Sequence, residues 1–288
     1  MDSPSTVDID IANIRYLCFG GGGIRGMAFA GALSELVALT RFDISSLRGA
    51  CGTSIGALYA AAVITGNSAE FIENMAKTTS LMDFVSPDVT KLFLNWGFDT
   101  QTKLIAWIDE HLGRRHLTFG QLFAESGKIL RVTTTELHAC DTYVIDYQSE
   151  PDMPIAQGVA MSMTLPPLFA PVQYRGKLYV DGGIFHNYPV DLFPAEETLG
   201  FKVLWGHSPS LNGFEKYFAR LTYAVLASSE RSLWKSLSET HRQHTIAIDC
   251  GDVSTINFRL SENETTTMLN RGRAQVRAFV HAHNVHAV

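Results

Sequence analysis

The sequence predicts an α/β sandwich with a mostly parallel central sheet, formed as a single domain over residues 1–288. Short apolar segments of strand length alternate with longer apolar segments of helical character, which is typical of parallel sheets covered by helices. Hydrophobic residues make up 46% of the chain, enough for a substantial core. Because no repeat, low-complexity tract or Pro/Ser-rich linker divides the sequence, we expect one core over about 14–280 and a short polar tail over 1–12.

A glycine run follows the first expected strand. Residues 14–19 form that strand, residues 20–23 are all glycine, and an apolar helix is expected over 24–39. Unencumbered backbone N–H groups at the start of a helix bind anionic oxygen, so the run is suited to hold an oxyanion or a phosphate. A dinucleotide is the weaker interpretation, because no Gly-Lys-Ser/Thr follows the glycines and no acidic residue ends the next strand to bind a ribose.

The second expected strand, over 48–51, leads into Gly52-Thr53-Ser54-Ile55-Gly56, and a strong helix-forming segment over 57–64 follows at once. Strand, G-x-S-x-G and helix in this order are typical of a nucleophile elbow, in which small flanking residues leave room for neighbouring backbone. The motif alone is not specific, because a serine in this place also caps helices. Together with the glycine run, it predicts Ser54 as the nucleophile of a serine hydrolase.

The base that would activate the serine has more than one candidate. A short strand over 178–180 ends at Asp181-Gly182-Gly183, where a tight turn directs the carboxylate out of the sheet edge. An isolated Asp-Gly-Gly is also a common turn in which the Asp bonds its own backbone. His186 and His207 follow apolar runs and are the alternatives for a Ser-His-Asp triad. Five other histidines are expected to be ordinary surface residues: His241, His244, His281, His283 and His286.

Three motifs in order, Gly21-Gly22-Gly23-Ile24-Arg25-Gly26, Gly52-Thr53-Ser54-Ile55-Gly56 and Asp181-Gly182-Gly183, resemble the signatures of the patatin-like phospholipases. The block over 160–172 and Asn187-Tyr188-Pro189 are similar to the family's segments on either side of the Asp. The resemblance runs from about Ile14 to Phe279 and takes in 246–249, Asn257-Phe258 and a last helix. Only the segment after Val190, including 201–210, matches loosely; we expect it to be a strand and a loop near the site.

The resemblance implies a three-layer α/β/α fold and a Ser-Asp dyad in place of a triad. By this likeness Ser54 is the nucleophile and Asp181 the general base, whose pKa desolvation would raise. The oxyanion donors would be Gly21, Gly22 and Gly23, with Arg25 adding positive charge nearby; Gly26, Gly52, Gly56, Gly182 and Gly183 are the motif glycines. The implied activity is phospholipase A-type hydrolysis of acyl lipids through an acyl-enzyme. An esterase or acyltransferase acting on a glyceride or thioester, or a lipase that needs a protein activator, stays open.

Composition disfavours several classes of ligand. A net charge of −6 without a concentrated basic stretch argues against nucleic acid. No acidic or His cluster has calcium or zinc spacing, so neither a metal nor a cofactor is expected. The four cysteines are far apart and predict reduced core thiols: Cys18, Cys51, Cys140 and Cys250. An acidic first segment and the lack of an apolar run of membrane length predict a cytoplasmic protein that contacts membranes only at their surface.

A lipase takes its substrate from a membrane or micelle, so we expect an apolar region near the site. The segment 81–98 is rich in bulky apolar residues and is interrupted by Pro87 and Gly97. It is either a mobile lid at the acyl site, with Trp96 and Phe98 at its edge, or buried core. Two small basic clusters are either solvated helix faces or contacts for anionic head groups: Arg114-Arg115-His116, and Arg271 with Arg273 and Arg277.

Overall fold

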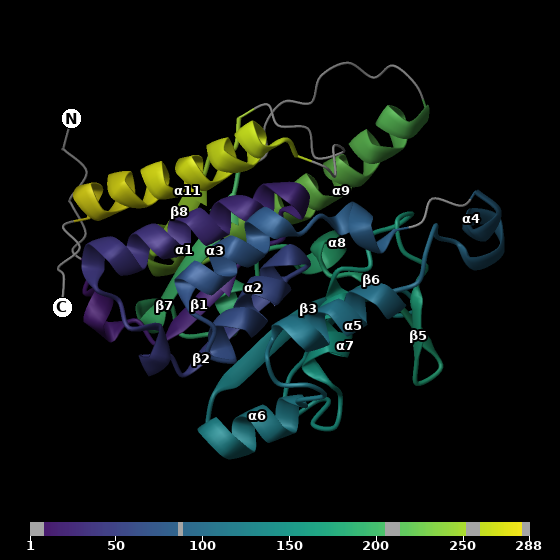
Figure 1. Cartoon of the computed structure of the whole chain (residues 1–288), viewed down its shortest axis with the longest axis horizontal. Helices are drawn as coiled ribbons and strands as arrows, with labels where there is room; N and C mark the ends of the chain where they lie inside the picture. Colours follow the sequence, from purple (N-terminus) through teal and green to yellow (C-terminus); the bar gives the residue numbers. More distant parts are fainter. Residues whose placement is uncertain (1–8, 86–88, 205–213, 252–259, 284–288) are drawn as a thin grey trace.

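The computed structural model describes residues 9–85, 89–204, 214–251 and 260–283. Within them one sheet of eight strands forms, in the order β5-β6-β3-β2-β1-β7-β8, with β4 paired to β3 (Figure 1). The strands are β1 (Tyr16–Phe19), β2 (Gly49–Thr53), β3 (Ile129–Glu136), β4 (Asp141–Ile145), β5 (Val172–Tyr174), β6 (Lys177–Asp181), β7 (Thr198–Val203) and β8 (Thr245–Ile248). The central strands β3, β2, β1, β7 and β8 are parallel, and β4, β5 and β6 are antiparallel additions.

Helices cover both faces of this sheet. They are α1 (Met27–Thr40), α2 (Ile55–Ile64), α3 (Ala69–Thr78), α4 (Val89–Asn95), α5 (Thr102–His111), α6 (Phe119–Ser126), α7 (Ile155–Ser162), α8 (Gly183–His186), α9 (Phe214–Ser236), α10 (Glu239–Gln243) and α11 (Glu262–Ala282). Helices α1, α2 and α7 pack with Leu17, Phe19 and Ala50 in the main core on one face. The alternate side chains Cys18 and Cys51 face the other way, into a smaller core that includes residues of α9. The three-layer α/β/α prediction is therefore confirmed.

Helix α11 closes the main core by lying along α1 (Figure 1). Glycines permit this contact: a Cβ on Gly31 would lie 2.2 Å from the carbonyl oxygen of Leu269, and one on Gly272 would lie 2.0 Å from that of Ala28. The two helix backbones are thus close enough to exclude any side chain at these positions.

The expected elements are present with small shifts at their ends. The strand over 14–19 begins at Tyr16, and the helix over 24–39 is a 3₁₀ turn, Gly23–Gly26, followed by α1. Packing begins before residue 14, because Ile9 and Ile11 are buried in the main core. Of the segment 201–210, residues 201–203 lie in β7 and 205–210 fall outside the described residues, as do Asn257 and Phe258.

Several predicted environments need correction. Cys18, Cys51 and Cys250 are buried, but Cys140 is exposed in the turn between β3 and β4, so it is not a core thiol. His241 and His244 are buried and not surface residues, because α10 packs on β7 and each imidazole contacts a backbone carbonyl. The basic residues of α11 are mostly committed to partners on the protein: Arg273 pairs with Glu73, and Arg277 with Glu35.

Candidate active site

Strand β3 brings the two predicted catalytic side chains together. Thr53, the last residue of β2, pairs with Thr133, and Asp181, the last residue of β6, pairs with the next residue, Thr134. Strand β4 occupies the opposite edge of β3 over this stretch, so β2 and β6 approach each other end to end along one edge. Ser54 and Asp181 thus meet where the two strands end, at the carboxyl edge of the parallel sheet, where α/β folds place ligand sites.

Ser54 has the strained backbone of a nucleophile elbow. Its φ of 54° and ψ of −127° lie in a region that L-residues rarely adopt. The neighbouring glycines are required by close contacts: a Cβ on Gly52 would lie 2.3 Å from the carbonyl oxygen of Gly56, and one on Gly56 would lie 2.1 Å from that of Phe19. The turn between β2 and α2 therefore fits only small residues, and it holds Ser54 in place.

The elbow is fixed by a serine that sequence reasoning did not single out. Ser162, the last residue of α7, accepts a hydrogen bond of 2.7 Å from the N–H of Ser54 and donates one of 2.6 Å to the carbonyl oxygen of Thr133. Its side chain is fully buried. The sequence offered one signal, since Ser162 lies in the block over 160–172, but nothing in that block distinguished it from its neighbours.

Asp181 is buried, and the side chain of Ser54 lies close enough to its carboxyl to lower the carboxyl pKa. Asp181 also accepts a hydrogen bond of 2.8 Å from the N–H of Gly183, which is the local contact expected of a turn-forming Asp. Burial raises the pKa of Asp181 to about 6, and its interactions with Ser54 and Gly183 oppose that rise. Gly182 permits the approach, because a Cβ there would lie 2.3 Å from the carbonyl oxygen of Thr133.

The glycine loop lies against the elbow. A Cβ built on Gly21 would lie 3.6 Å from the Cβ of Ser54, and one on Gly26 would lie 2.4 Å from the side chain of Ile55. The N–H of Gly21 donates to the carbonyl oxygen of Asn187 at 2.8 Å, so it is not free to bind an oxyanion, which corrects the expectation for Gly21. Within the described ranges, the N–H groups of Gly22 and Gly23 have no protein acceptor.

Arg25 lies in the 3₁₀ turn that follows the loop, and its side chain is buried. Its Nη1 donates to the carbonyl oxygen of Leu204, at the end of β7, at 3.4 Å. A buried guanidinium one turn from the glycine N–H groups adds positive charge to that region. Its role towards an oxyanion stays a prediction.

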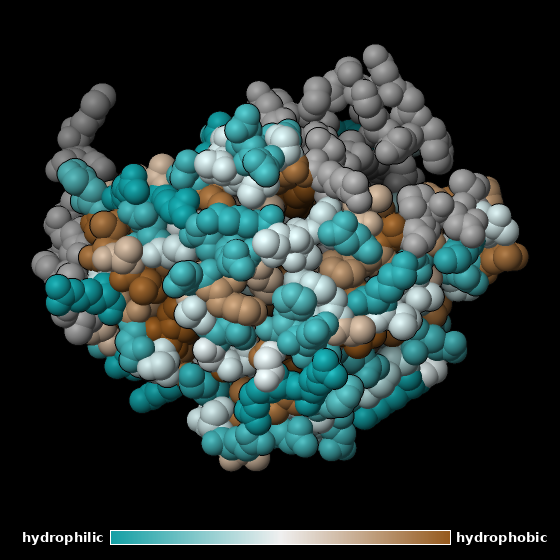
Figure 2. Space-filling model, viewed as in Figure 1, coloured by the Kyte–Doolittle hydropathy of each residue, from teal (hydrophilic) through white to brown (hydrophobic). Residues whose placement is uncertain are grey.

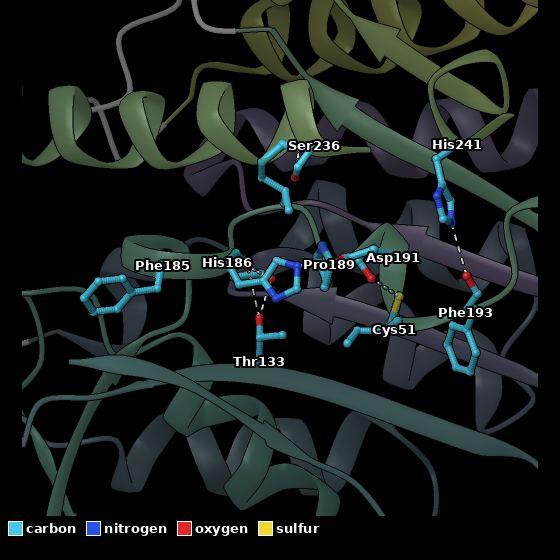
Figure 3. A network of polar contacts seen from close by, with 12 residues as sticks. Cys51, Thr133, Phe185, His186, Pro189, Asp191, Phe193, Ser236 and His241 are labelled. Atoms are coloured by element: carbon cyan, nitrogen blue, oxygen red, sulfur yellow. Dashed lines mark hydrogen bonds and ion pairs between the residues drawn. The ribbon is translucent and has the colours of Figure 1, made fainter. Parts of the chain in front are cut away.

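The two candidate histidines do not form a triad with Ser54 in the described structure. His186 Nε2 lies 2.8 Å from Asp191 Oδ1. The backbone carbonyl oxygen of His186 accepts one hydrogen bond from Thr133 (Figure 3) and another from Thr53. The imidazole is therefore paired with Asp191 and not with Ser54. His207 lies outside the described residues. Among the described histidines, none is hydrogen-bonded to Ser54.

An apolar cavity of about 250 Å³ adjoins the loop and the elbow helix. Gly23 and Ile55 line the part nearest the predicted nucleophile. The other lining residues come from α1, α2, α3, η4 (Leu81–Phe84), α5, α11 and adjoining segments, and they include Met27, Leu58, Tyr59, Phe84 and Trp107. Its walls are mostly apolar, so it is suited to a hydrocarbon chain and not to a polar group.

The described residues lack two further features. In that part of the chain, no three His, Cys, Asp or Glu side chains are grouped so as to hold a metal ion. Across the same residues, no helix combines the length and the apolar character needed to cross a bilayer.

Viral and bacterial proteins are similar to this chain. A protein of Acanthamoeba polyphaga mimivirus, described as uncharacterized, is 25% identical over 96% of the chain and 97% of its own length. A probable lipid hydrolase of Invertebrate iridescent virus 6 is 26% identical over 62% of each sequence. The uncharacterized protein YqhO of Bacillus subtilis is 24% identical over 91% of the chain and 96% of its own length.

Solved structures share the fold. VipD from Legionella pneumophila superposes with a TM-score of 0.62 at 17% identity, over 98% of this chain and 72% of its own. ExoU of Pseudomonas aeruginosa, solved in complex with SpcU, superposes with a TM-score of 0.56 at 15% identity, over 95% of this chain and 53% of its own. The Patatin-like phospholipase family model matches residues 17–194, which is well over half of the chain. The matched range includes both Ser54 and Asp181. The chain therefore belongs to the patatin-like phospholipase family.

Proposed function

We propose that the protein is a lipid acyl hydrolase of the phospholipase A type, which cleaves carboxylic esters through Ser54 and Asp181. The meeting of a strained serine and a buried carboxyl at one edge of β3 carries the proposal, and the raised pKa of that carboxyl supports it. Membership of the family, together with a viral relative described as a probable lipid hydrolase, supports lipid hydrolysis as the activity. The dyad itself rests on the geometry.

In the proposed mechanism, ionised Asp181 accepts the proton of the Ser54 hydroxyl as the serine oxygen attacks the ester carbonyl. The carbonyl oxygen becomes an oxyanion that the N–H groups of Gly22 and Gly23 would bind; no acceptor for them lies among the described residues. The carbon–oxygen bond to the alcohol then breaks, and the alcohol leaves with the proton held by Asp181. Water repeats the sequence on the acyl-enzyme: Asp181 takes its proton, and collapse returns a proton to Ser54 and releases the fatty acid.

The apolar cavity beside Gly23 and Ile55 is the proposed site of the acyl chain. It lies on the main-core side of the sheet, so an acyl group bound to Ser54 would extend away from α8 and α9 and towards α1 and α5. Because the cavity is small, one chain fits, and the glycerol and head group would remain outside it.

Helix α4 supports a membrane contact. Phe93, Leu94 and Trp96 are 77%, 74% and 64% exposed, and hydrophobic atoms appear at that edge of the molecule (Figure 2). Phe84 and Val85 are buried in the main core and Phe98 packs partly buried against it, so the segment 81–98 joins the core at these residues and is exposed at Phe93, Leu94 and Trp96. Pro87 lies outside the described residues. We propose that the exposed residues insert into a lipid surface, which agrees with a cytoplasmic protein that binds membranes peripherally.

Hydrolysis of a fluorogenic phospholipid in the presence of a chelator tests the dyad. We expect activity in the wild type and a loss of about a thousandfold or more in both Ser54→Ala and Asp181→Asn, with circular dichroism confirming that each variant is folded. Activity that persists in folded Asp181→Asn would contradict the assignment of the base. Activity that is lost in chelator and restored by calcium would contradict a metal-free reaction.

A panel of acyl esters identifies the substrate class. Phospholipids should be cleaved faster than glycerides or acyl thioesters of the same chain length. If a thioester or a glyceride is preferred, the chemistry stands and the phospholipase assignment falls. Because the structurally similar ExoU was solved in complex with SpcU, we propose testing whether this chain also binds a protein partner.

A further inference from the structure

Asn187 is a buried polar residue that has no part in the proposed mechanism. It follows α8 in the Asn187-Tyr188-Pro189 segment, and its side chain is buried behind the two motifs. Its Oδ1 lies 2.3 Å from a Cβ built on Gly21 and 2.7 Å from one built on Gly183. Asn187 thus fills the space between the glycine loop and the turn that carries Asp181.

Asn187 is hydrogen-bonded to both backbone polar groups of Gly21. The carbonyl oxygen of Asn187 accepts from the N–H of Gly21 at 2.8 Å, and the Nδ2 of Asn187 donates to the carbonyl oxygen of Gly21 at 3.2 Å. The second bond matters for the oxyanion, because the C=O of Gly21 and the N–H of Gly22 belong to one planar trans peptide and point in opposite directions. Fixing the carbonyl from one side therefore fixes where the Gly22 N–H points on the other.

The Asn187 amide is in turn oriented by an ion pair on the second face of the sheet. Its Nδ2 donates to Glu230 Oε2 at 2.7 Å, and Glu230 Oε1 lies 2.7 Å from Lys202 Nζ. Both charged side chains are buried, and the ammonium of Lys202 lies 4.1 Å from the ring centroid of Trp234. A carboxylate acceptor allows only the amide NH₂, and not the amide oxygen, to face Glu230. The same NH₂ is then directed at Gly21.

We infer that Asn187 is a positioning residue for the Gly21–Gly22 peptide, and that the Glu230–Lys202 ion pair orients Asn187 for that role. The inference rests on the proposed function, in which the N–H of Gly22 binds the oxyanion. Glu230 and Trp234 come from α9 and Lys202 from β7, so these two elements act on the reaction without touching the substrate. A hydrogen bond accepted by the Gly21 carbonyl also polarises the peptide and makes the Gly22 N–H a stronger donor.

A purely structural role would give different results. Buried ion pairs are costly to form, and removing one partner destabilises a protein wherever the pair lies. Glu150 is a control for loss of a buried carboxylate, because it is about as buried as Glu230, accepts hydrogen bonds from Tyr143 and Tyr174 and pairs with the exposed Arg175 at the β5 edge of the sheet. Loss of stability alone should therefore appear in Glu150→Gln as well as in Glu230→Gln.

The kinetic test compares Asn187→Ala, Glu230→Gln and Glu150→Gln on a soluble ester. We expect kcat to fall about a hundredfold in Asn187→Ala and about tenfold in Glu230→Gln, with KM within about twofold and kcat unchanged in Glu150→Gln. A thionoester adds a specific readout, because sulfur is a poorer hydrogen-bond acceptor than oxygen. The preference of the wild type for the oxygen ester should shrink in the first two variants only. Wild-type kcat in folded Asn187→Ala, or an unchanged preference, would overturn the inference.

The amide signal of Gly22 in ¹⁵N NMR spectra tests the same inference without turnover. It should shift in Asn187→Ala and Glu230→Gln and stay in place in Glu150→Gln. If the wild type hydrolyses no ester while the Gly22 signal shifts as expected, the proposed function fails and the positioning of the peptide stands. If the wild type is active and the signal does not shift, the positioning role fails alone.

Discussion

At the scale of single residues, the raised pKa of Asp181 determines the pH range of the reaction. Burial raises this pKa to about 6, and only the ionised carboxylate can accept the proton of Ser54. We expect kcat/KM on a soluble ester to rise tenfold per pH unit below about pH 6 and to level off above it. A stopped-assay pH profile measures this. A profile that levels off near pH 4 would contradict a buried base.

Burial of the ionised Asp181 carboxylate also lowers the stability of the folded protein at neutral pH. The folded-state pKa of Asp181 lies above its ordinary value of 3.8, so the folded protein binds this proton more tightly than the unfolded chain does. Stability should therefore fall as the pH rises from about 4 to about 6, by up to about 3 kcal/mol from this group. Asp181→Asn removes the cost, and its free energy of unfolding in urea should exceed that of the wild type at pH 7 by about 1–3 kcal/mol, but not at pH 4.

Asp191 provides the control with the opposite sign. Its hydrogen bond and ion pair with His186 hold the pKa of Asp191 below its ordinary value, against the effect of burial. Its contribution to stability is therefore present at neutral pH and is lost as the pH falls through the folded pKa. Asp191→Asn should destabilise the protein at pH 7. If Asp181→Asn and Asp191→Asn changed the free energy of unfolding equally at pH 7, burial of the Asp181 carboxylate would not be destabilising.

At the scale of elements, α4 is predicted to dock the enzyme on lipid. Burying a large apolar side chain contributes about 1.5–3 kcal/mol, so partial insertion of three such residues exceeds a tenfold change in affinity. Replacing Phe93, Leu94 and Trp96 by serine should lower the rate on vesicles about tenfold or more and leave the rate on a soluble short-chain ester unchanged. Leu39→Ser, an exposed leucine on α1, should change neither rate. Equal losses on both substrates would place these residues in the site itself.

At the contact between α1 and α11, a glycine-to-alanine substitution should destabilise the protein, opposite to its usual effect in a helix. Replacing glycine by alanine within a helix ordinarily stabilises it by about 0.5–1 kcal/mol. At Gly272 the added Cβ would lie 2.0 Å from the carbonyl oxygen of Ala28, so the helices must separate. We expect Gly272→Ala to lower the melting temperature by several degrees and Thr266→Ala, on an exposed position of the same helix, to leave it unchanged or raised. A stabilised Gly272→Ala would show that α11 can shift without loss of packing.

The elements, and the turns that carry Ser54 and Asp181, were predictable because they are encoded locally, whereas the role of Asp181 came only from the family resemblance. Strand, small-residue turn and helix around Ser54, and strand followed by Asp-Gly-Gly at Asp181, each lie within a few consecutive residues. The contacts of Ser162 and Asn187 could not be predicted from the sequence, because both join segments that are distant along the chain. Ser162 bonds Ser54 across 108 positions, and Asn187 bonds Glu230 across 43. The engagement of the Gly21 N–H followed from the same kind of long-range pairing.

At the scale of the whole molecule, net charge limits how the protein approaches a membrane. The chain carries a net charge of −6, so it is repelled by an anionic bilayer. The basic residues that might have opposed this are largely paired, including Arg114 with Glu125, Arg273 with Glu73 and Arg277 with Glu35. We therefore predict that docking on a membrane comes from the exposed apolar side chains Phe93, Leu94 and Trp96 in and just after α4.

Ionic strength separates apolar docking from electrostatic docking. Raising the salt concentration from about 0.01 M to about 0.15 M shortens the screening length from about 30 Å to about 8 Å, which weakens the repulsion from an anionic bilayer and leaves apolar insertion intact. Binding to anionic vesicles, measured by sedimentation with the Ser54→Ala protein to prevent hydrolysis, should therefore strengthen with salt, whereas binding to zwitterionic vesicles should not change. Binding to anionic vesicles that weakens with salt would instead assign docking to the basic clusters, because only attraction between opposite charges is lost by screening.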